Sequence, residues 1–479
     1  MSKVGITSIG AHIPYFYLER DVIANAWGGI NLKGVRSMAN VDEDSVTMAV
    51  EAVRNCFRFI DKQQITNLYF ASVSAPYAEK SHAGIVATAC GLPRKLFTAD
   101  FMSSTKSGTS AMKSAMDAVK ADYKSLAIVT AADCRNAYPK TLKEQILGDA
   151  AAAVAIGSEN VIANIDYFTT VSDEIVDVWR NAGEQFVNWG EDRFIIENGY
   201  MNSLSHVINE ILDTASMQPS DFSKIILPAP GMREYLRLAK KLGFDQEQVQ
   251  NPLLMEVGDC GTAHTMLLLA AALENARPGD SLLLANYGNG ADAMILTVTE
   301  EVKKIQNNLL VQNLLSNRRS FPDYNRFLSF RSICPTVPSR YNLKPSNAKT
   351  WREQDTFLRF NGGKCTKCGA EIFPMNRVCY KCGAIDEFEK TELSDRISKV
   401  FTFTLDMLAG SSDDPVVGQI CADDEFGVRY YTVITDFNPQ DIKIGMPLEF
   451  TFRKMHALGN FNNYYWKFKP QRSLGVEPE

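Results

Sequence analysis

The sequence predicts a duplicated α/β body followed by a zinc ribbon and a small β-barrel. An internal repeat indicates the body: a Gly-Thr pair, a helix of small and apolar residues, a polar turn and a buried strand occur twice. Two closely spaced cysteine pairs indicate the ribbon, and short runs of alternating apolar and polar residues near the C-terminus indicate the barrel. At 479 residues the chain is too long for one core of ordinary size, so several domains are expected.

The repeat starts at Gly108 with GTSAMKSAMDAVKADYKSLAIVTAAD and again at Gly261 with GTAHTMLLLAAALENARPGDSLLLANYG. Two copies of one helix-and-strand pattern predict two similar halves. Three of the expected strands are apolar apart from Thr130, namely residues 126–131, 151–156 and 282–285. Such strands are typical of sheets that helices cover on both faces. A helix is also expected over residues 46–56, with Ser45 as its N-cap.

From about Ser316 the sequence changes character. The segment 316–350 holds four prolines and no sustained period, so it is expected to be a linker and docking arm. Beyond the cysteine pairs, alternating runs predict the strands of a small barrel at residues 398–405, 428–435, 448–453 and 464–469. The expected domains are two halves of the body at 1–165 and 166–335, a linker at 336–352, a helix and zinc ribbon at 353–394, and an OB-type barrel with its tail at 395–479.

The composition is that of a globular protein, with 45% hydrophobic and 22% charged residues. A net charge of -6 and a pI near 5.6 argue against a dedicated nucleic-acid-binding protein. No apolar run reaches the roughly eighteen residues that span a bilayer, and the N-terminal segment lacks the pattern of a signal peptide. The cysteines outside the two pairs are scattered, as expected of buried thiols in a reducing compartment. We therefore expect a cytoplasmic protein with no membrane and no nucleic-acid partner.

The two cysteine pairs, Cys365 with Cys368 and Cys379 with Cys382, follow the spacing C-x2-C-x10-C-x2-C, and a glycine follows each pair. Two such tight turns direct four thiolates at one tetrahedral centre, which is the arrangement that Zn²⁺ accepts. The alternative is two coincidental pairs of surface cysteines, which the doubled spacing argues against. Since the protein would supply all four ligands, no coordination position stays open, and the predicted zinc is structural rather than catalytic.

Several segments of the body resemble the thiolase superfamily, in particular its archaeal and bacterial hydroxymethylglutaryl-CoA synthase branch. The matching motifs are VDEDSVTMAVEAVRN from Val41, the APY turn at Ala75, GIVATACGLPRKLFTADF from Gly84, LGDAAAAVAIG from Leu147, ARPGDSLLLANYGNGADA from Ala276 and FPDYNRFLSFRSICP from Phe321. The C-terminal part, with WREQDTFLRFNGGKCTKCG and DFNPQDIKIGMPLEF, resembles ribbon and OB-fold proteins encoded beside thiolases, which are thought to bind or channel acyl-CoA. The resemblance implies a five-layer αβαβα thiolase-like body fused to a rubredoxin-like zinc ribbon and an OB barrel, coenzyme A as part of the substrate, and a dimer.

The same resemblance identifies the positions where such synthases carry their catalytic groups, and this chain differs at each. The family's cysteine lies at the start of the repeat helix, where the helix dipole lowers its pKa. That position falls at Thr105, or at Ser104 with a small insertion. The histidine position falls at Pro228, the asparagine position at Asp259 and the general-base glutamate position at Val73. The means of making a covalent acyl-enzyme is therefore expected to be lost.

A hydroxyl at Thr105 is a poor nucleophile unless a base takes its proton, and the family's histidine is missing. The resemblance leaves an oxyanion hole of main-chain N–H groups near Thr105 and in the glycine loop, typically worth about 3 kcal/mol each. Ser104, Gly288 and Gly290 are thus the expected oxyanion or substrate-binding residues. Such donors also stabilise the enolate formed in aldol cleavage of a β-hydroxyacyl-CoA, which needs no covalent intermediate. Other thiolase-like proteins without the cysteine act as such aldolases together with ribbon/OB partners.

The acid–base candidates near the expected cleft are Asp259, His264 and Tyr287, with Cys260 and His82 as outsiders. His264 lies about one helical turn beyond Asp259, so the two could share a helix start. Each candidate has an ordinary alternative. His264 could be a satisfied histidine on a packed helix, Tyr287 a packing aromatic and Asp259 a helix cap.

Four functions are weighed. The preferred one is an enzyme that makes or breaks a C–C bond next to a CoA thioester by aldol chemistry, hence a lyase. The second is a synthase-like or thiolase-like acyltransferase with another nucleophile, such as Cys260 or Cys90. The third is a non-catalytic acyl-CoA-binding subunit, paired with a catalytic thiolase-like chain instead of forming a homodimer. Nucleic-acid binding, suggested by the basic and aromatic tail FRKMHALGNFNNYYWKFKPQR, is disfavoured by the acidic total.

Overall fold

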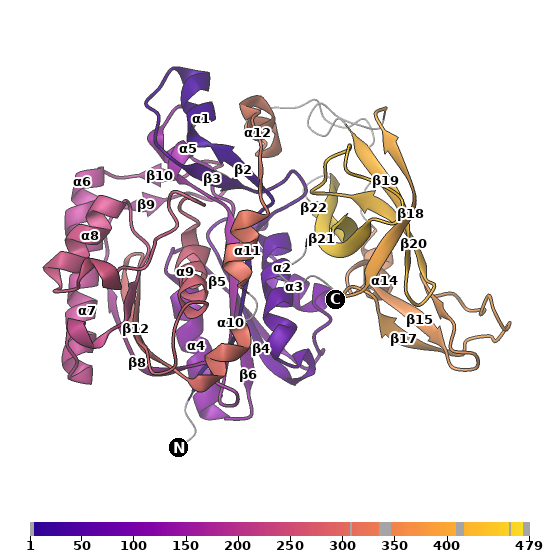
Figure 1. The fold of residues 1–479 in the computed structure, drawn as a ribbon, viewed down its shortest axis with the longest axis horizontal. Helices are drawn as coiled ribbons and strands as arrows, with labels where there is room; N and C mark the ends of the chain where they lie inside the picture. Colours follow the sequence, from indigo (N-terminus) through magenta and orange to yellow (C-terminus); the bar gives the residue numbers. More distant parts are fainter. Residues whose placement is uncertain (1–3, 307–308, 335–345, 409–415, 459–460, 473–479) are drawn as a thin grey trace.

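The computed structural model describes residues 4–306, 309–334, 346–408, 416–458 and 461–472. The body fills the left and centre of Figure 1, and a small C-terminal sheet and a closed barrel lie along its right-hand side. One nine-stranded sheet runs through the body in the order β11-β12-β13-β8-β1-β7-β6-β4-β5. Within the described ranges, no helix combines the length and apolar character needed to cross a membrane.

The order of this sheet confirms the duplication that the sequence repeat predicts. The N-terminal half contributes β1 (Gly5–His12), β4 (Ile65–Ser72), β5 (Phe97–Met102), β6 (Leu126–Asp133) and β7 (Ala150–Gly157). The C-terminal half contributes β8 (Ala163–Ser172), β11 (Lys224–Ile226), β12 (Ser281–Tyr287) and β13 (Gly290–Val298). In each half a parallel pair, β4–β6 or β11–β12, is followed by two antiparallel pairings, β6–β7–β1 or β12–β13–β8. At the edge of the C-terminal half, a parallel bridge between Ile225 and Val249 occupies the position that edge strand β5 has in the N-terminal half.

Helices cover the sheet on its outer faces and fill the space between the halves. On the outside lie α2 (Ser45–Cys56), α3 (His82–Ala89), α7 (Met201–Ala215) and α8 (Met232–Lys241). The two repeat helices, α4 (Ser107–Ala121) and α9 (His264–Leu273), lie between the halves (Figure 1). All residues of α9 are buried, which explains why its sequence is apolar on every side. From left to right in this view, the layers are helices, the strands of the C-terminal half, the repeat helices, the strands of the N-terminal half and helices again.

The N-terminus of α2 corrects one sequence expectation. Ser45 is the first helical residue, and the N-cap is Asp44, whose carboxylate accepts the N–H groups of Val46 and Thr47. The Thr47 side chain in turn accepts the N–H of Asp44, which completes a capping box. The prediction of Ser45 as the cap is wrong because the preceding carboxylate satisfies two free N–H groups at once.

Shorter elements complete the body. A small sheet has the order β14-β2-β3, from β2 (Phe16–Glu19), β3 (Val35–Met38) and β14 (Arg319–Ser320). The other short pieces are α1 (Arg20–Trp27), α5 (Leu142–Ile146), β9 (Val178–Trp179), β10 (Asn188–Trp189), α6 (Asp192–Phe194), a π-helix (Ile195–Tyr200), α10 (Lys303–Gln306), α11 (Leu310–Ser316) and α12 (Tyr324–Phe330). Tyr324, Phe327 and Leu328 of α12 are buried against Leu18 and Ile23. This part of the expected docking arm is therefore an ordered helix on the body.

The C-terminal part holds two small sheets. The first, in the order β16-β15-β17, follows α13 (Asn347–Arg352) and α14 (Gln354–Phe357) and consists of β15 (Asn361–Cys365), β16 (Glu371–Ile372) and β17 (Phe388–Glu392). The second is a closed barrel, β18-β19-β20-β22-β21, from β18 (Ile397–Asp406), β19 (Val417–Asp424), β20 (Arg429–Ile434), β21 (Pro447–Leu458) and β22 (Phe461–Pro470).

Two details of this part differ from the sequence expectation. The expected linker at 336–352 lies partly outside the described residues, and its described end is helical, because α13 begins at Asn347. Strand β19 was not expected from the pattern. Its buried positions include Gly418 and Ala422, whose small side chains weaken the apolar alternation.

The barrel packs directly on the body. Both contribute to one apolar cluster, which includes Val53 of α2 and Trp466 of β22. Beside this cluster, Lys469 of β22 pairs with Glu51 of α2 over 2.7 Å. Removing the barrel would therefore expose part of the core of the body.

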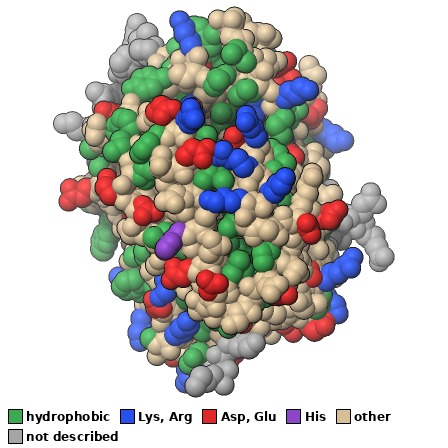
Figure 2. Space-filling model, turned by 90° about the vertical axis from the view of Figure 1, so that its left-hand side faces the viewer, with side chains coloured by type: hydrophobic (Ala, Val, Ile, Leu, Met, Phe, Trp, Pro, Cys, Tyr) green, Lys and Arg blue, Asp and Glu red, His purple; other side chains and the backbone are tan. Residues whose placement is uncertain are grey.

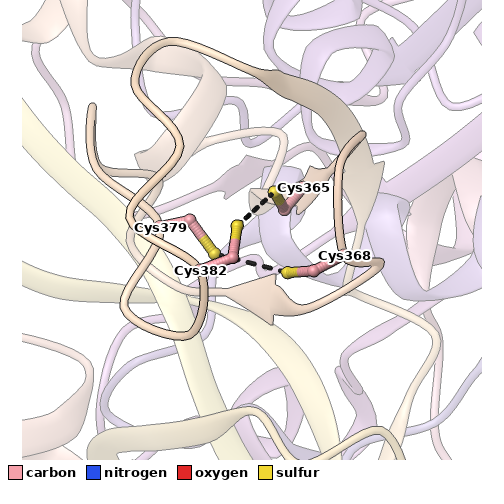
Figure 3. Close-up of side chains that lie close together, drawn as sticks. All are labelled: Cys365, Cys368, Cys379 and Cys382. Carbon is pink, nitrogen blue, oxygen red and sulfur yellow. Dashed lines mark hydrogen bonds between the residues drawn. The ribbon is translucent and has the colours of Figure 1, made fainter.

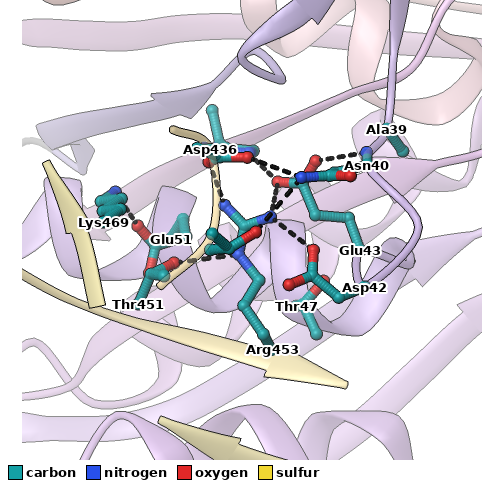
Figure 4. Close-up of polar contacts among 12 residues, drawn as sticks. Ala39, Asn40, Asp42, Glu43, Thr47, Glu51, Asp436, Thr451, Arg453 and Lys469 are labelled. Carbon is teal, nitrogen blue, oxygen red and sulfur yellow. Dashed lines mark hydrogen bonds and ion pairs between the residues drawn. The ribbon is translucent and has the colours of Figure 1, made fainter. Parts of the chain in front are cut away.

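A buried ion network joins the same two parts (Figure 4). The guanidinium of Arg453 on β21 lies 3.2 Å from Asp42, 3.0 Å from Glu43 and 2.7 Å from Asp436. The Arg453 side chain is 0% exposed. Buried ion pairs are costly when broken and have few satisfactory arrangements. The network therefore defines how the barrel sits on the loop that precedes α2.

Candidate active site and cysteine cluster

Two cavities of the body meet at Thr105, Arg135 and Asp177, which line both. One, here called the α8 arm, has a volume of 310 Å³ and is bordered by residues 228–230, which lead into α8. The other, here called the Tyr77 arm, has a volume of 570 Å³ and extends to Tyr77. The main-chain N–H of Asn462 on β22 donates to the Tyr77 hydroxyl over 2.9 Å. The barrel therefore contacts a lining residue of the second arm.

The turn between β5 and α4 places Ser104 and Thr105 at the cavity. Ser103, just before them, has a φ of 77°, a conformation that costs a non-glycine residue free energy and often marks a functional site. The Thr105 hydroxyl donates to the main-chain carbonyl of Tyr287 over 3.1 Å, and the Ser104 hydroxyl donates to that of Gly288 over 2.9 Å. Both hydroxyl protons therefore hold the turn against the loop after β12 and do not face a side-chain base.

The glycine loop after β12 packs tightly on this turn. A Cβ at Gly288 would lie 2.6 Å from the Thr105 Oγ1 and 2.8 Å from the Lys106 nitrogen, so the position requires glycine. The N–H of Gly288 donates to the carbonyl of Gly290 over 2.9 Å. Gly290 has a φ of 105°, and a Cβ there would overlap the carbonyl of Val171. The expected oxyanion role of the Gly288 N–H is not supported, because the loop uses this donor internally.

Asp259 and Arg135 form an ion pair where the arms meet. The Nη2 of Arg135 lies 2.8 Å from the Oδ1 of Asp259, which also accepts the N–H of Gly261 over 3.0 Å. The Arg135 side chain is 4% exposed and that of Asp259 is 39% exposed. Burial acts to raise the pKa of Asp259, but the charges of Arg135 and His264 and the hydrogen bonds from Gly261 and Arg135 together outweigh it, and the pKa falls to about 2. Asp259 therefore stays ionised near neutral pH and is a weak base.

His264 begins α9 but does not line either arm. Its Nδ1 accepts the N–H of Cys260 over 3.1 Å, and its Nε2 lies 2.8 Å from the carbonyl of Pro252. Burial lowers the pKa of His264, although the nearby Asp259 carboxylate opposes this. Of the two sequence interpretations, the geometry matches the ordinary one: a neutral histidine with both ring nitrogens bonded to the main chain.

Tyr287 lines the α8 arm and is paired with a residue that sequence reasoning missed. Its hydroxyl donates to the Oδ2 of Asp177 over 2.8 Å, and Asp177 is 4% exposed. Burial raises the pKa of Tyr287, and the Asp177 carboxylate raises it further, so the phenol stays neutral. A Cβ at Gly199 would overlap the Tyr287 hydroxyl. Gly199 belongs to the π-helix, an uncommon element that is frequent at functional sites.

The structure brings together the four positions selected by the family resemblance. Val73 lines the Tyr77 arm, Pro228 and Asp259 line the α8 arm, and Thr105 lines both. These positions surround one cavity system although they come from four separate segments of the chain. None of the four side chains is a thiol or an imidazole.

The remaining candidates, His82, Cys260 and Cys90, do not line either arm of the cavity. The Nδ1 of His82 is 3.0 Å from Asp100, and its ring stacks on Tyr77. Cys260 and Cys90 are buried, and burial raises the pKa of both thiols. Neither thiol lines an arm of the cavity. The structure therefore gives no support to either cysteine as the substitute nucleophile.

Arg135 and Asp177 are charged residues that line both arms, and the sequence analysis missed them. Arg135 lies two residues beyond Asp133, the last residue of β6. The carboxyl end of a strand in a parallel pair is a common place for ligand-binding residues, and this signal could have found Arg135. Asp177 lies in an irregular segment after β8, where no periodicity or motif singles it out.

The four cysteines of the doubled motif converge in the C-terminal part (Figure 3). The sulfur of Cys365 is 3.7 Å from that of Cys382, and the sulfur of Cys368 is 3.6 Å from that of Cys379. All four sulfur atoms lie within 4.8 Å of one another. A tetrahedral zinc with bonds of about 2.3 Å requires sulfur atoms about 3.8 Å apart. The donor set and its spacing therefore fit a four-coordinate Zn²⁺.

Comparisons with known proteins place the body in a family. Residues 212–299 match the family model described as 3-oxoacyl-[acyl-carrier-protein (ACP)] synthase III C terminal. The chain is 32% identical over 344 residues to the hydroxymethylglutaryl-CoA synthase of Picrophilus torridus, covering 69% of this chain and 97% of that protein. Its identity to the hydroxymethylglutaryl-CoA synthase of Methanosphaera stadtmanae is 31% over 340 residues, covering 68% of this chain and 98% of that protein.

Solved structures show the same fold. An HMG-CoA synthase complexed with CoA matches with a TM-score of 0.62 at 20% identity, covering 69% of this chain and 90% of that one. The 3-oxoacyl-[acyl-carrier-protein] synthase III of Aquifex aeolicus VF5 matches with a TM-score of 0.54 at 18% identity, covering 61% of this chain and 99% of that one. The body thus has the thiolase-like α/β fold, and the chain belongs to the hydroxymethylglutaryl-CoA synthase family.

Proposed function

We propose that this protein makes or breaks a carbon–carbon bond next to a coenzyme A thioester, by aldol or retro-aldol chemistry and without a covalent acyl-enzyme. The observation that carries the proposal is the Thr105 hydroxyl, which takes the place of the family's nucleophile and donates its proton to the main-chain carbonyl of Tyr287. A hydroxyl held in this way has no base to activate it. Pro228, at the position of the family's histidine, cannot supply one.

Coenzyme A enters along the α8 arm in this proposal. Exposed basic residues follow the 228–230 segment on α8, namely Arg233, Arg237, Lys240 and Lys241. Figure 2, which views the side that carries α6 to α8, shows Lys and Arg side chains grouped near the middle of that face. Phosphate groups are attracted to such a surface. The thioester then lies near Thr105, and the acyl group extends into the Tyr77 arm.

Tyr287 and Asp177 are the proposed acid–base groups. In the retro-aldol direction, the β-hydroxyl of the substrate gives its proton to the Tyr287–Asp177 pair as the Cα–Cβ bond breaks. The products are a carbonyl compound and a thioester enolate, which takes up a proton at Cα. The Thr105 main-chain N–H, at the start of α4, is the proposed main-chain donor to the thioester oxygen. Asp259 remains ionised and orients Arg135.

The family relatives favour one alternative, an acyltransferase of the hydroxymethylglutaryl-CoA synthase type. It would need an acyl group on a side chain of this protein. Intact-mass spectrometry after incubation with short and aromatic acyl-CoAs separates the two. A stoichiometric adduct on Thr105, Ser104 or Cys260 would replace the aldol proposal with acyl transfer.

We also propose that the C-terminal part is a structural zinc ribbon followed by an OB-type barrel. The sulfur spacing supports the zinc, and the five-stranded closed barrel supports the OB assignment. When bound, the metal would hold the turns of the ribbon. Since all four donors are cysteines of the chain, zinc has no part in the proposed reaction.

The decisive experiment is a turnover assay with β-hydroxyacyl-CoAs of increasing size. Mass spectrometry should detect a shorter acyl-CoA and a carbonyl compound in equal amounts. If the purified protein binds the thioesters but converts them only after a second thiolase-like chain is added, it is a binding subunit and the proposal is wrong.

A further inference from the structure

Arg135 lies where the two arms meet and has unused hydrogen-bonding capacity. Its Nη2 bonds to the carboxylate of Asp259 over 2.8 Å and to the carbonyl of that residue over 3.2 Å. Its Nε and Nη1 make no hydrogen bond to any other described residue. The side chain is 4% exposed. A buried cationic group with free donors is costly unless a ligand or water satisfies it.

The surroundings of Arg135 hold it in one orientation. Asp259 binds one edge of the guanidinium. Asp133, the last residue of β6, lies nearby and accepts hydrogen bonds from the Thr262 hydroxyl over 2.7 Å and the Ser72 hydroxyl over 2.9 Å. A Cβ at Gly261 would lie 3.0 Å from the Nε of Arg135, so the main chain passes close on that side. The guanidinium is thus positioned before any ligand arrives, which is the condition for electrostatic stabilisation without reorganisation.

We propose that Arg135 is a catalytic residue that binds the thioester oxygen as it becomes an enolate oxygen, and that the substrates are therefore β-hydroxyacyl thioesters. This inference rests on the function proposed above and names the group that stabilises its charge. The arginine fills the role that the internally bonded Gly288 N–H cannot. Because Asp259 already balances its charge, Arg135 accepts a neutral carbonyl in the ground state and gains most when negative charge develops.

The chemistry of one step follows from this placement. A base removes the Cα proton of a β-ketoacyl thioester, or the Cα–Cβ bond of a β-hydroxyacyl thioester breaks. In both cases the electron pair moves onto the thioester oxygen, which receives a hydrogen bond from Arg135. The oxygen gives this charge back when Cα is protonated. The step needs no oxidant or reductant.

A β-ketoacyl thioester reports this interaction directly, because its enolate absorbs in the near ultraviolet and its neutral form does not. Acetoacetyl-CoA is titrated with pH in the presence of excess wild-type protein, Arg135→Gln, Arg135→Lys and Arg429→Gln. Arg429 is an exposed arginine of the barrel paired with Asp423, so its replacement is the matched control. Coenzyme A affinity is measured for each variant by calorimetry.

The wild-type protein and Arg429→Gln should form the bound enolate at least one pH unit lower than Arg135→Gln does, a tenfold effect on the ionisation equilibrium. Arg135→Lys should give an intermediate value, and coenzyme A affinity should stay within about threefold. The titratable groups that interact with Arg135 are Asp133, Asp259, the Cys260 thiol and His264. The double variant Arg135→Gln with Asp259→Asn removes both charges of the pair and serves if Arg135→Gln alone does not fold.

Three results would overturn the assignment. If the Arg135 variants that fold bind acetoacetyl-CoA with the wild-type ionisation midpoint, Arg135 does not touch the enolate. The wild-type protein could bind coenzyme A without lowering the ionisation midpoint of acetoacetyl-CoA below that of the free thioester. In that case the role of Arg135 is wrong, but the proposed CoA site is retained. If the wild-type protein binds neither coenzyme A nor its thioesters, the proposed function fails as well.

Discussion

At the scale of single residues, the site is defined by what its hydrogen bonds already use. Thr105 and Ser104 give their hydroxyl protons to carbonyls, Gly288 gives its N–H to the loop, and His264 is bonded at both ring nitrogens. Among the candidate side chains, those left for a substrate in our proposal are Arg135 and the Tyr287–Asp177 pair, beside the main-chain N–H of Thr105. The catalysis that we propose for these groups differs from the cysteine and histidine chemistry of the synthases that the chain resembles.

The first prediction concerns Thr105. Thr105→Val should keep turnover of a β-hydroxyacyl-CoA within about fivefold of wild type, because the hydroxyl contributes one hydrogen bond worth about 1 kcal/mol. Initial rates measured at saturating substrate check this. A loss of a thousandfold or more in Thr105→Val, restored by Thr105→Ser, would show that the hydroxyl is a nucleophile.

The second prediction concerns the acid–base pair. Tyr287→Phe and Asp177→Asn should each lower kcat about a hundredfold, because each removes a proton-transfer group, and should leave CoA affinity nearly unchanged. Tyr430→Phe is the matched control. Its hydroxyl also donates to an aspartate, Asp424, over 2.8 Å, but it lies in the barrel. If both Tyr287→Phe and Asp177→Asn keep wild-type turnover, the pair is not the acid–base group.

At the scale of elements, the repeat helices and the cysteine turns organise the two candidate sites. The segment before α9 presents Asp259 to the cavity and turns His264 into the core, so two neighbouring candidates receive different roles. The ribbon, by contrast, has only three short strands, in the order β16-β15-β17. Such a small sheet buries little apolar surface, so we expect its stability to depend on the proposed zinc.

The third prediction is that the protein binds about one zinc per chain and that the ribbon loses its structure without it. Cys368→Ser should make residues 361–392 sensitive to limited proteolysis and reduce the zinc found by elemental analysis. Cys421→Ser, at a barrel cysteine outside the cluster, is the control. A Cys368→Ser variant that resists protease and loses only turnover would contradict a structural role.

At the scale of the whole molecule, the barrel is part of the folded unit. It shares an apolar cluster with α2, contributes Arg453 and Lys469 to buried ion pairs, and bonds to Tyr77 at the cavity. A truncation that removes the barrel therefore tests stability as well as acyl-CoA binding. Single substitutions at the interface separate the two effects better.

The fourth prediction is a pH dependence of this interface. Burial acts to raise the pKa of Asp42, but Lys467 and Arg453 outweigh it, and the pKa falls to about 2. A lowered pKa adds stability above the ordinary value of 3.8, and this stability is lost as pH falls towards 2. We expect Asp42 to account for about 2 kcal/mol of that loss.

Chemical unfolding followed by tryptophan fluorescence, at pH values between 5 and about 2, measures this contribution. Asp42→Asn should be less stable than wild type at pH 5 and should lose less stability on acidification. Asp213→Asn, at an exposed position on α7, should follow the wild-type curve. If Asp42→Asn and wild type lose equal stability, Asp42 does not carry the effect.

Features that depend on residues close together in the chain could be predicted from the sequence. The repeat at Gly108 and Gly261 predicted the duplicated sheet, which the strand order confirms, because each copy contains its own helix, turn and strand. The cysteine spacing predicted the cluster of four sulfurs, since two short turns carry all four donors. The family motifs selected Val73, Thr105, Pro228 and Asp259, which do share one cavity system.

The roles of individual groups depended on contacts between segments far apart in sequence. No local pattern shows that Asp259 is paired with Arg135, that Tyr287 meets Asp177, or that Arg453 of the barrel binds Asp42 before α2. The ring of His264 was ambiguous for the same reason, because its partner Pro252 is brought to it by the fold of the preceding loop. A side chain's protonation and availability follow from its burial and its partners, and both exist only once the separate segments have packed together.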